Sequence, residues 1–335
     1  MKIAVFSTKP YDRRFLEAAN LAVPAPHRLI FHEARLDACS AVAASDAEGV
    51  CPFVNDQVDA RVLRILRGNG TRLICLRCAG YNNVDVKTAH ALQMAVARVP
   101  AYSPHAVAEH TLAILLSLIR RIHRAYARVR EGNFALDGLL GFDLHGRTVG
   151  VIGTGNIGLI VSQILAGFGC EVLGTDPVEN DHFPGSYVAL NDLLARSDII
   201  SLHCPLNPET RHMIDAGAIA RMKDGITIIN TSRGAVIDTR AIIMGLKSGK
   251  IGQLGLDVYE EASGIFFEDL SDQPIVDDTL ARLLTFPNVL ITGHQGFFTA
   301  DALRAIAATT IANATAFETQ GAPLHPVGIS QVTPG

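Results

Sequence analysis

The feature that most constrains this chain is a glycine-rich turn near its middle. Residues 148–158 have the sequence TVGVIGTGNIG, an apolar strand pattern that leads into three glycines spaced GxGxxG. A helical pattern follows over 157–168, and a second apolar segment ends at Asp176, 18 residues after Gly158. This order of strand, glycine turn, helix and strand is typical of a βαβ unit that binds a dinucleotide.

Each position of the turn has a physical reason. Gly153 allows the tight turn, Gly155 lets the backbone approach a pyrophosphate, and Gly158 lets the helix pack against the strand. Asn156 and Ile157 begin the helix, whose free N–H groups and positive dipole end face the pyrophosphate. A purely structural glycine turn in another α/β fold would not need this complete unit.

The acidic residue after the second strand indicates which dinucleotide is bound. Asp176 is placed to accept hydrogen bonds from the adenosine ribose hydroxyls. Its negative charge would repel the 2′-phosphate of NADP. The sequence therefore predicts NAD as the cofactor.

Short apolar segments alternate with helical patterns along the whole chain. The first series of expected strands covers 2–7, 28–32, 49–54, 72–78 and 94–99, and the second covers 148–152, 171–176, 198–204, 226–231, 254–258 and 289–292. Runs this apolar suit parallel strands buried on both faces. We therefore expect an α/β protein of two doubly wound parallel-sheet domains with a cleft between them, one a Rossmann dinucleotide-binding domain and the other flavodoxin-like.

Domain boundaries follow from the position of the fingerprint. The residues before it suffice for a separate α/β domain, and 48% of the 335 residues are hydrophobic, enough for two cores. We expect the NAD-binding domain over 102–299 and a discontinuous substrate domain over 1–101 plus 300–335, because a helix predicted over 299–319 could pack back on the first sheet. A long helix is predicted over 104–130, and its apolar side chains are a candidate interface between subunits.

Composition excludes several other classes of function. The formal net charge is −4, with no basic excess to neutralise phosphates, so we expect no nucleic-acid partner. The apolar run over 111–119 is too short to span a membrane, and residues 1–14 lack the apolar core of a secretory signal. The six cysteines include one CxxC at 75–78 but no second pair, so we expect reduced thiols, no metal site and a cytoplasmic protein.

Seven motifs together carry a family resemblance. They are RCAGYN at 77–82, PAYSPHAVAEH at 100–110, the glycine fingerprint, HCPL at 203–206, NTSRG at 230–234, LDVYE at 256–260 and GHQ at 293–295. In this order and spacing the chain resembles the D-isomer-specific 2-hydroxyacid dehydrogenases, and within them the NAD-dependent D-lactate dehydrogenases. The resemblance extends over roughly residues 2–320.

The position of Arg233 suggests a carboxylate clamp. Arg233 follows the expected strand 226–231, at the carboxyl end where ligands bind in doubly wound sheets, and Gly234 allows a turn after it. A guanidinium can bind a substrate carboxylate bidentately and polarise the adjacent carbonyl. The resemblance implies this role for Arg233.

A histidine occupies the matching place on another strand. His294 follows the expected strand 289–292, and an imidazole there can donate a proton to an alkoxide or accept one in the reverse reaction. The resemblance implies that His294 is this catalytic acid and base.

The third catalytic residue is where the chain departs from the family. The pattern places an acid five residues after Asp257, but that position is Ala262, and Glu261 precedes it. One hypothesis is that the loop shifts by one residue, so that Glu261 pairs with His294; Gly264 would make the loop pliant. The other is that the acid is missing, which would lower the pKa of His294.

The resemblance also implies the remaining site residues. Cofactor contacts fall on Cys204 and Pro205 near the adenosine, and on Thr231, Ser232 and Asp257 near the nicotinamide. Substrate contacts fall on Ala79 and Gly80 through backbone N–H groups, and on Tyr102, Phe297 and Phe298. The two phenylalanines would shield a small methyl group.

These features predict the NADH-dependent, reversible reduction of pyruvate to D-lactate, and the resemblance implies a homodimer or homotetramer. Two alternatives remain open from the sequence. One is the reduction of another small 2-ketoacid, such as hydroxypyruvate. The other is a non-catalytic NAD-sensing interaction protein, which the altered acid position would permit.

Overall fold

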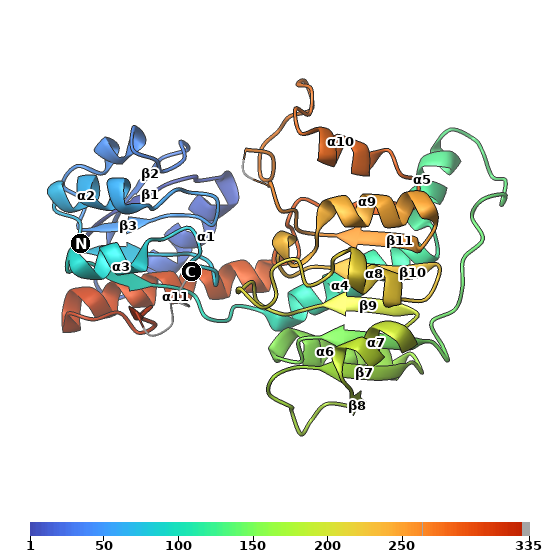
Figure 1. Ribbon diagram of the computed structural model, residues 1–335. Helices are drawn as coiled ribbons and strands as arrows, with labels where there is room; N and C mark the ends of the chain where they lie inside the picture. The colour runs from blue at the N-terminus through green and yellow to red at the C-terminus, as the bar shows by residue number, and fades with distance from the viewer. Residues whose placement is uncertain (263, 330–335) are drawn as a thin grey trace. The chain divides into compact units, whose positions relative to one another are not determined.

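The computed structural model describes residues 1–262 and 264–329, and these form two compact units (Figure 1). The first unit contains Met1–Ser103 together with the C-terminal segment from Phe298, and the second contains Pro104–Phe297. Each unit is built around one fully parallel sheet. This confirms the expected class of two parallel-sheet α/β domains.

The first unit has a five-stranded sheet in the order β2-β1-β3-β4-β5. Its strands are β1 (Lys2–Val5), β2 (Arg28–Phe31), β3 (Gly49–Cys51), β4 (Leu73–Cys75) and β5 (Ala95–Ala97). Its helices are α1 (Pro10–Leu21), α2 (Ala60–Gly68), α3 (Val86–Ala91) and α11 (Ala300–Gln320), with a 3-10 turn at Ser40–Ala44. This strand order is the flavodoxin-like one.

Alternation along the strands separates two cores in this unit. Ile3 and Val5 face a cluster that includes residues of α1 and α11, whereas Ala4 and Phe6 face a cluster that includes residues of α2 and α3. The C-terminal helix α11 therefore covers one face of the N-terminal sheet, because its apolar residues pack in one cluster with those of β1 and β4.

The second unit has a seven-stranded sheet in the order β12-β11-β10-β9-β6-β7-β8. Its strands are β6 (Thr148–Ile152), β7 (Glu171–Thr175), β8 (Ser186–Tyr187), β9 (Ile199–Leu202), β10 (Ile226–Asn230), β11 (Ile251–Leu256) and β12 (Val289–Ile291). Its helices are α4 (Pro104–Ile119), α5 (Ile122–Arg130), α6 (Asn156–Gly167), α7 (Leu190–Arg196), α8 (Ala216–Arg221), α9 (Thr239–Ser248) and α10 (Asp278–Leu284), with a 3-10 turn at Gly234–Val236. The order reverses between β6 and β9, as in a Rossmann sheet.

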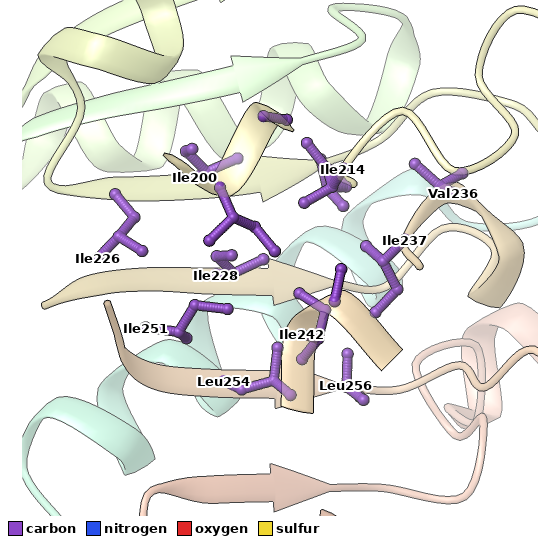
Figure 2. Packing of buried hydrophobic residues seen from close by; sticks show 14 of the residues in the cluster. Ile200, Ile214, Ile226, Ile228, Val236, Ile237, Ile242, Ile251, Leu254 and Leu256 are labelled. Atoms are coloured by element: carbon purple, nitrogen blue, oxygen red, sulfur yellow. The ribbon is translucent and has the colours of Figure 1, made fainter. Parts of the chain in front are cut away.

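Helices cover both faces of this second sheet. Figure 2 shows the cluster on one face, where Ile200, Ile228 and Leu254 pack with Ile242 of α9. On the other face Val149, Val151 and Ile199 pack with residues of α4 and α6. Burial of both faces explains why these strands are near-continuous apolar runs.

The helix predicted over 104–130 is two helices. Arg121 has a φ of +51°, in the left-handed region, and this ends α4 at Ile119 before α5 begins at Ile122. The apolar side chains of α4 are largely buried within the unit, against α6, β10 and β11. These buried side chains of α4 are not available to another subunit, and the interface predicted on the helix over 104–130 stays a prediction. None of the described helices combines the length and hydropathy that crossing a bilayer requires.

Candidate functional site

The glycine fingerprint forms the turn between β6 and α6. Gly153 has a φ of +90°, and a Cβ there would lie 2.7 Å from the backbone nitrogen of Cys204. A Cβ on Gly158 would collide with the carbonyl oxygen of Gly153, so the helix packs on the turn only because this residue is glycine. At Gly155 a Cβ would meet nothing within 4 Å, which leaves the backbone open to a ligand.

Helix α6 begins at Asn156, and its N-cap residue, Gly155, has no side chain that could cap the N–H groups of the first turn. Asn156 is exposed and Ile157 is partly exposed. These N–H groups and the open backbone of Gly155 are the donor set that a pyrophosphate requires. The residues present therefore fit the phosphate portion of NAD.

Asp176 lies at the carboxyl end of β7, beside the same turn. Its carboxylate accepts hydrogen bonds from the N–H of Thr154 at 2.7 Å and from the N–H of Val178 at 2.9 Å. A cavity of about 410 Å³ adjoins it, lined by Thr154, Gly155, Asp176 and 178–182. A carboxylate oriented by two backbone donors in such a cavity suits the ribose hydroxyls of NAD.

Cys204 and Pro205 follow β9, the strand next to β6. The backbone of Cys204 approaches Gly153 closely, and its thiol is buried, which raises the pKa of Cys204 to about 11. Pro205 is exposed. Both residues lie beside the glycine turn, but the thiol remains protonated at neutral pH and offers no nucleophile.

The turn that carries Arg233 follows β10 and is fixed by Asn230. The Asn230 side chain donates to the carbonyl of Arg233 at 2.9 Å and accepts from the N–H of Ser232 at 3.0 Å. Gly234 packs directly against the backbone of 259–260, where any Cβ would collide. Thr231 is buried and Arg233 is partly exposed, so the turn presents the guanidinium from a rigid base.

The turn that carries His294 follows β12 and is organised by a buried carboxylate. His294 has a φ of +57°, and its N–H donates to the carbonyl of Thr292 at 3.0 Å. Asp257, at the end of β11, accepts hydrogen bonds from the N–H groups of Gln295 and Gly296, both at 2.8 Å, and from the Thr292 hydroxyl. These bonds fix the backbone on both sides of the imidazole.

One further donor completes the Asp257 environment. His110 of α4 places Nε2 3.2 Å from Asp257 Oδ1 and 3.1 Å from Thr292 Oγ1. Although burial raises the pKa of Asp257, the hydrogen bonds from His110, Thr292 and the backbone outweigh it and lower that pKa. Asp257 is therefore a permanent anion at neutral pH.

The pKa of His294 depends on burial and on the charges of Asp257 and Arg233. Burial lowers the pKa of His294, the Asp257 charge raises it, and the Arg233 charge lowers it, with a net decrease. The ring of Phe267 lies 5.6 Å from the His294 ring and the ring of Phe297 lies 6.5 Å away, nearly edge-on. The structure thus brings Arg233, His294 and Phe297 into one region of the second unit.

Glu261 lies in the loop after β11, and its contacts bear on whether it can pair with His294. Glu261 is exposed, and among the described residues no hydrogen bond joins it to His294. Its neighbour Glu260 accepts hydrogen bonds from His212 at 2.8 Å and Arg211 at 3.2 Å, and Ala262 packs against the apolar cluster of Figure 2. The role of Glu261 as a third catalytic residue stays a prediction.

Four of the predicted substrate residues belong to the first unit. Ala79 and Gly80 follow β4, and the carbonyl of Ala79 accepts a hydrogen bond from Arg98 at 3.1 Å. Tyr102 lies just before α4. The ring of Phe298 lies edge-on to Tyr11 at 4.7 Å. The predicted phenylalanine pair is thus divided between the units, and these substrate contacts stay predictions.

Sequence reasoning gave no role to His110 or Thr292. His110 and Thr292 meet Asp257 across 147 and 35 residues of sequence, so no local spacing indicated the contact. The resembling motif at 100–110 contains His110 but gave it no role. Within the described ranges, no group of three or more His, Cys, Asp or Glu side chains could hold a metal ion.

Comparison with known proteins places this geometry in a family. Residues 112–296 match the family described as D-isomer specific 2-hydroxyacid dehydrogenase, NAD binding domain. A D-lactate dehydrogenase of Escherichia coli is 48% identical over 321 residues, covering 95% of this chain and 97% of that protein.

Two solved structures show the same architecture. The pyruvate reductase of Chlamydomonas reinhardtii has a TM-score of 0.90 and 41% identity, covering 97% of this chain and 98% of that one. D-lactate dehydrogenase from Aquifex aeolicus, complexed with NAD and lactic acid, has a TM-score of 0.83 and 32% identity, covering 96% and 98%. With the glycine turn and Asp176 in place, this chain belongs to the NAD-dependent D-isomer-specific 2-hydroxyacid dehydrogenases.

Proposed function

We propose that the protein catalyses the reversible, NADH-dependent reduction of pyruvate to D-lactate. The observation that carries the proposal is the placement of Arg233 and His294 on turns after β10 and β12, close enough for the guanidinium charge to act on the imidazole. A carboxylate clamp beside a proton donor is the pair that a 2-ketoacid requires. The pyruvate reductase and lactate-bound neighbours support this choice of substrate.

The chain's own residues supply two functions in this reaction. Arg233 binds the substrate carboxylate and polarises the C2 carbonyl. His294, protonated, donates its proton to the carbonyl oxygen as the C2 alkoxide forms. When bound beside them, NADH supplies the hydride to C2, so one hydride and one proton give the alcohol. In the reverse direction neutral His294 removes the hydroxyl proton.

The proposed chemistry has a defined pH dependence. The imidazole donates a proton only below its pKa, and burial with the Arg233 charge holds that pKa below the ordinary value of 6.5. We therefore expect kcat/KM for reduction to fall as pH rises through a midpoint below 6.5, and lactate oxidation to rise over the same interval. Initial rates in both directions across pH 4.5–9 measure this.

Substrate size follows from the rings around His294. Phe267 and Phe297 leave apolar surface beside the imidazole. An apolar enclosure favours the methyl group of pyruvate over the hydroxymethyl group of hydroxypyruvate, because a buried hydroxyl without a partner is unfavourable. A panel of 2-ketoacids assayed with NADH tests this, and a higher kcat/KM for hydroxypyruvate would overturn the choice of pyruvate.

Arg233→Lys tests the clamp directly. Lysine keeps the charge but loses the bidentate fork, so we expect a higher KM for pyruvate, a lower kcat and little change in NADH affinity. The matched control is Arg240→Lys, an exposed arginine in the first turn of α9. Kinetics of Arg233→Lys that match those of the control would place the clamp elsewhere.

Two variants test whether an acidic residue at position 261 or 262 raises the pKa of His294. If Glu261 pairs with His294 in the working enzyme, Glu261→Gln lowers reduction and moves the pH midpoint down. If the acid is missing, Glu261→Gln changes little, and Ala262→Glu raises activity above pH 7 because an anion raises the pKa of the imidazole. If neither variant changes the reduction activity or its pH profile, while folding and NADH binding stay intact, both hypotheses are excluded.

The proposal includes a homo-oligomer, with its interface on α5, the second half of the helix predicted over 104–130, and on the segment that follows. Ile122, Tyr126 and Val129 of α5 are between 47% and 63% exposed, and Phe134, Leu136 and Leu140 are between 74% and 88% exposed. Soluble monomers rarely expose so many large apolar side chains together. We propose that a second copy of the chain covers them in a homodimer or homotetramer, which sedimentation equilibrium of the wild type and of Leu136→Asp would test.

The remaining assignments concern partners and location. All six cysteines are free thiols, Cys51 and Cys75 being buried, and this suits a reducing compartment. The proposal accordingly places the enzyme in the cytoplasm, acting on small molecules without a nucleic-acid or membrane partner. Fractionation of cells that express the protein tests the cytoplasmic location.

A further inference from the structure

Adjacent residues of α4 bind the two catalytic turns of the second unit. His110 contacts Asp257 and Thr292, which hold the turn carrying His294. Thr111, the next residue, places its hydroxyl 2.9 Å from the Thr231 hydroxyl, two residues before Arg233. One turn of one helix is thus bonded to the ends of β10, β11 and β12.

The hydrogen positions at His110 follow from its acceptors. The Asp257 carboxylate can only accept, and the Thr292 hydroxyl donates its hydrogen to Asp257. Nε2 of His110 lies 3.2 Å from Asp257 Oδ1 and 3.1 Å from Thr292 Oγ1, so it must carry the hydrogen that both oxygens share. His110 therefore donates into the cluster that fixes His294.

The direction of the bond at Thr111 is also determined. The Thr111 hydroxyl donates to the carbonyl of Val107 at 2.8 Å, and a hydroxyl has only one hydrogen to give. The Thr231 hydroxyl must then donate to Thr111 at 2.9 Å. Thr111 is 1% exposed and Thr231 is 8% exposed, so loss of this bond leaves a hydroxyl without its partner away from water.

We propose that His110 and Thr111 are positioning residues that set the separation of the His294 imidazole from the Arg233 guanidinium. Neither side chain touches the substrate in this proposal; each holds one turn against the same rigid helix. The proposal rests on the proposed function, in which Arg233 and His294 act together on one 2-ketoacid. A misplacement on the order of 1 Å is enough to reduce such catalysis by about two orders of magnitude.

Because each residue holds a different turn, the two variants have different kinetic signatures. Thr111→Val keeps the shape and removes the hydroxyl, so it loosens the Arg233 turn and raises KM for pyruvate about five- to tenfold, the effect of roughly one hydrogen bond. His110→Ala loosens the His294 turn, so it lowers kcat at least about tenfold and shifts the pH midpoint of reduction.

Conservative variants separate positioning from simple support of the fold. Thr111→Ser restores the hydroxyl and should return KM to within about twofold of wild type, since the bond is re-formed. His110→Gln offers an amide hydrogen in place of Nε2–H and should recover most of kcat. His105→Gln is the matched control, because His105 is an exposed histidine in the first turn of the same helix.

The measurements are initial rates with pyruvate and NADH, NADH affinity by fluorescence, oxamate affinity of the NADH complex by calorimetry, and Tm. Weaker oxamate binding in Thr111→Val but not in His110→Ala supports the inference without relying on turnover. Wild-type enzyme that reduces no 2-ketoacid contradicts the proposed function instead. If the wild type is active, two outcomes overturn the inference. In the first, Thr111→Val and His110→Ala both behave like His105→Gln. In the second, both variants show the same fall in kcat, rise in KM and fall in Tm, and the conservative variants restore none of them.

Discussion

The two sheets of this protein place similar turns at similar points but put opposite chemistry there. In each sheet the strand order reverses beside the first strand of the unit, between β1 and β3 in one and between β6 and β9 in the other. Each of these first strands leads into a helix through a turn that contains a residue with positive φ, Ser7 in one and Gly153 in the other. Topology alone would permit a ligand at either point.

In the first unit, buried side chains fill this point. Arg77 is 2% exposed and pairs with Asp12 at 3.2 Å, and it also donates to the carbonyl of Ser7 at 2.9 Å. Asp56 accepts hydrogen bonds from the Ser7 hydroxyl and from the backbone N–H groups of Leu36 and Phe53. In the second unit, glycines leave the same place open. Side-chain volume, rather than strand order, therefore decides which sheet binds the dinucleotide.

The largest expected effect is a loss of stability when the buried cation Arg77 is replaced. Arg77→Met leaves Asp12 buried without its cation, and breaking a buried pair in this way costs about 3–5 kcal/mol of the free energy of unfolding. We expect this loss in the first unit, with NADH affinity unchanged. Chemical denaturation followed by hydrogen exchange in β1 and β4 measures the loss.

Arg72→Met is the matched control for Arg77→Met. Arg72 lies five residues earlier and pairs with Glu48 at 3.1 Å, but its side chain is 56% exposed. An exposed pair contributes only about 0–1 kcal/mol. Equal losses in the two variants would show that burial of Arg77 does not stabilise the turn.

The second prediction fills the open turn. Gly155→Ala adds a Cβ that meets no protein atom, so Tm should not change, but the methyl enters the space of the pyrophosphate. We expect NADH affinity to fall by more than about 100-fold, because the backbone can no longer approach the phosphates. Fluorescence titration with NADH, together with Tm, measures both.

Gly153→Ala and Gly167→Ala complete this set. At Gly153 a φ of +90° and the contact with Cys204 should cost at least about 2 kcal/mol of stability in addition to NADH affinity. Gly167, in the last turn of α6, has open space around it, and its change to alanine should leave both quantities intact. If Gly155→Ala binds NADH normally, the open backbone is not the phosphate site.

What the sequence could predict depends on how local the signal is. The fingerprint of Gly153, Gly155 and Gly158 lies within six residues, and the strands that precede Arg233 and His294 are plain apolar runs. These features are fixed by backbone geometry and period, so they were predictable. The parallel-sheet fold followed from the same patterns.

The parts that could not be predicted depend on contacts between distant segments. The burial of Arg77 needs Asp12, 65 residues away, and the role of Asp257 needs His110, 147 residues away. The break between α4 and α5 falls on Arg121, a residue with no intrinsic preference for the left-handed region. Tertiary packing decides such cases, and one sequence does not display it.

The third prediction concerns the charge that borders the open turn. Asp176→Ala removes the repulsion of a 2′-phosphate along with an acceptor for the ribose hydroxyls, so NADH binding weakens and NADPH binding gains. We expect the ratio of kcat/KM for NADH to that for NADPH to fall about tenfold, for an electrostatic difference near 1.4 kcal/mol.

Asp192→Ala is the control for Asp176→Ala, since Asp192 is an exposed acidic residue of α7 in the same unit. Its cofactor ratio should equal that of the wild type. Equal efficiency of the unmutated enzyme with both cofactors would refute the role given to Asp176.

The smallest expected effect is the difference between two variants of Ser7, about 0.5–1 kcal/mol, which separates the contributions of its hydroxyl and its backbone. Ser7 has a φ of +50°, which glycine adopts without strain, yet its hydroxyl donates to the buried Asp56. Ser7→Ala loses this bond and keeps the strain, so it should cost about 2 kcal/mol, the value of a hydrogen bond to a charged group. Ser7→Gly loses the bond but relieves about 0.5–1 kcal/mol of strain, so it should cost about 1 kcal/mol. Neither change should alter NADH affinity. A glycine variant less stable than the alanine variant would show that the backbone at Ser7 is unstrained, and that the two turns differ in side-chain content alone.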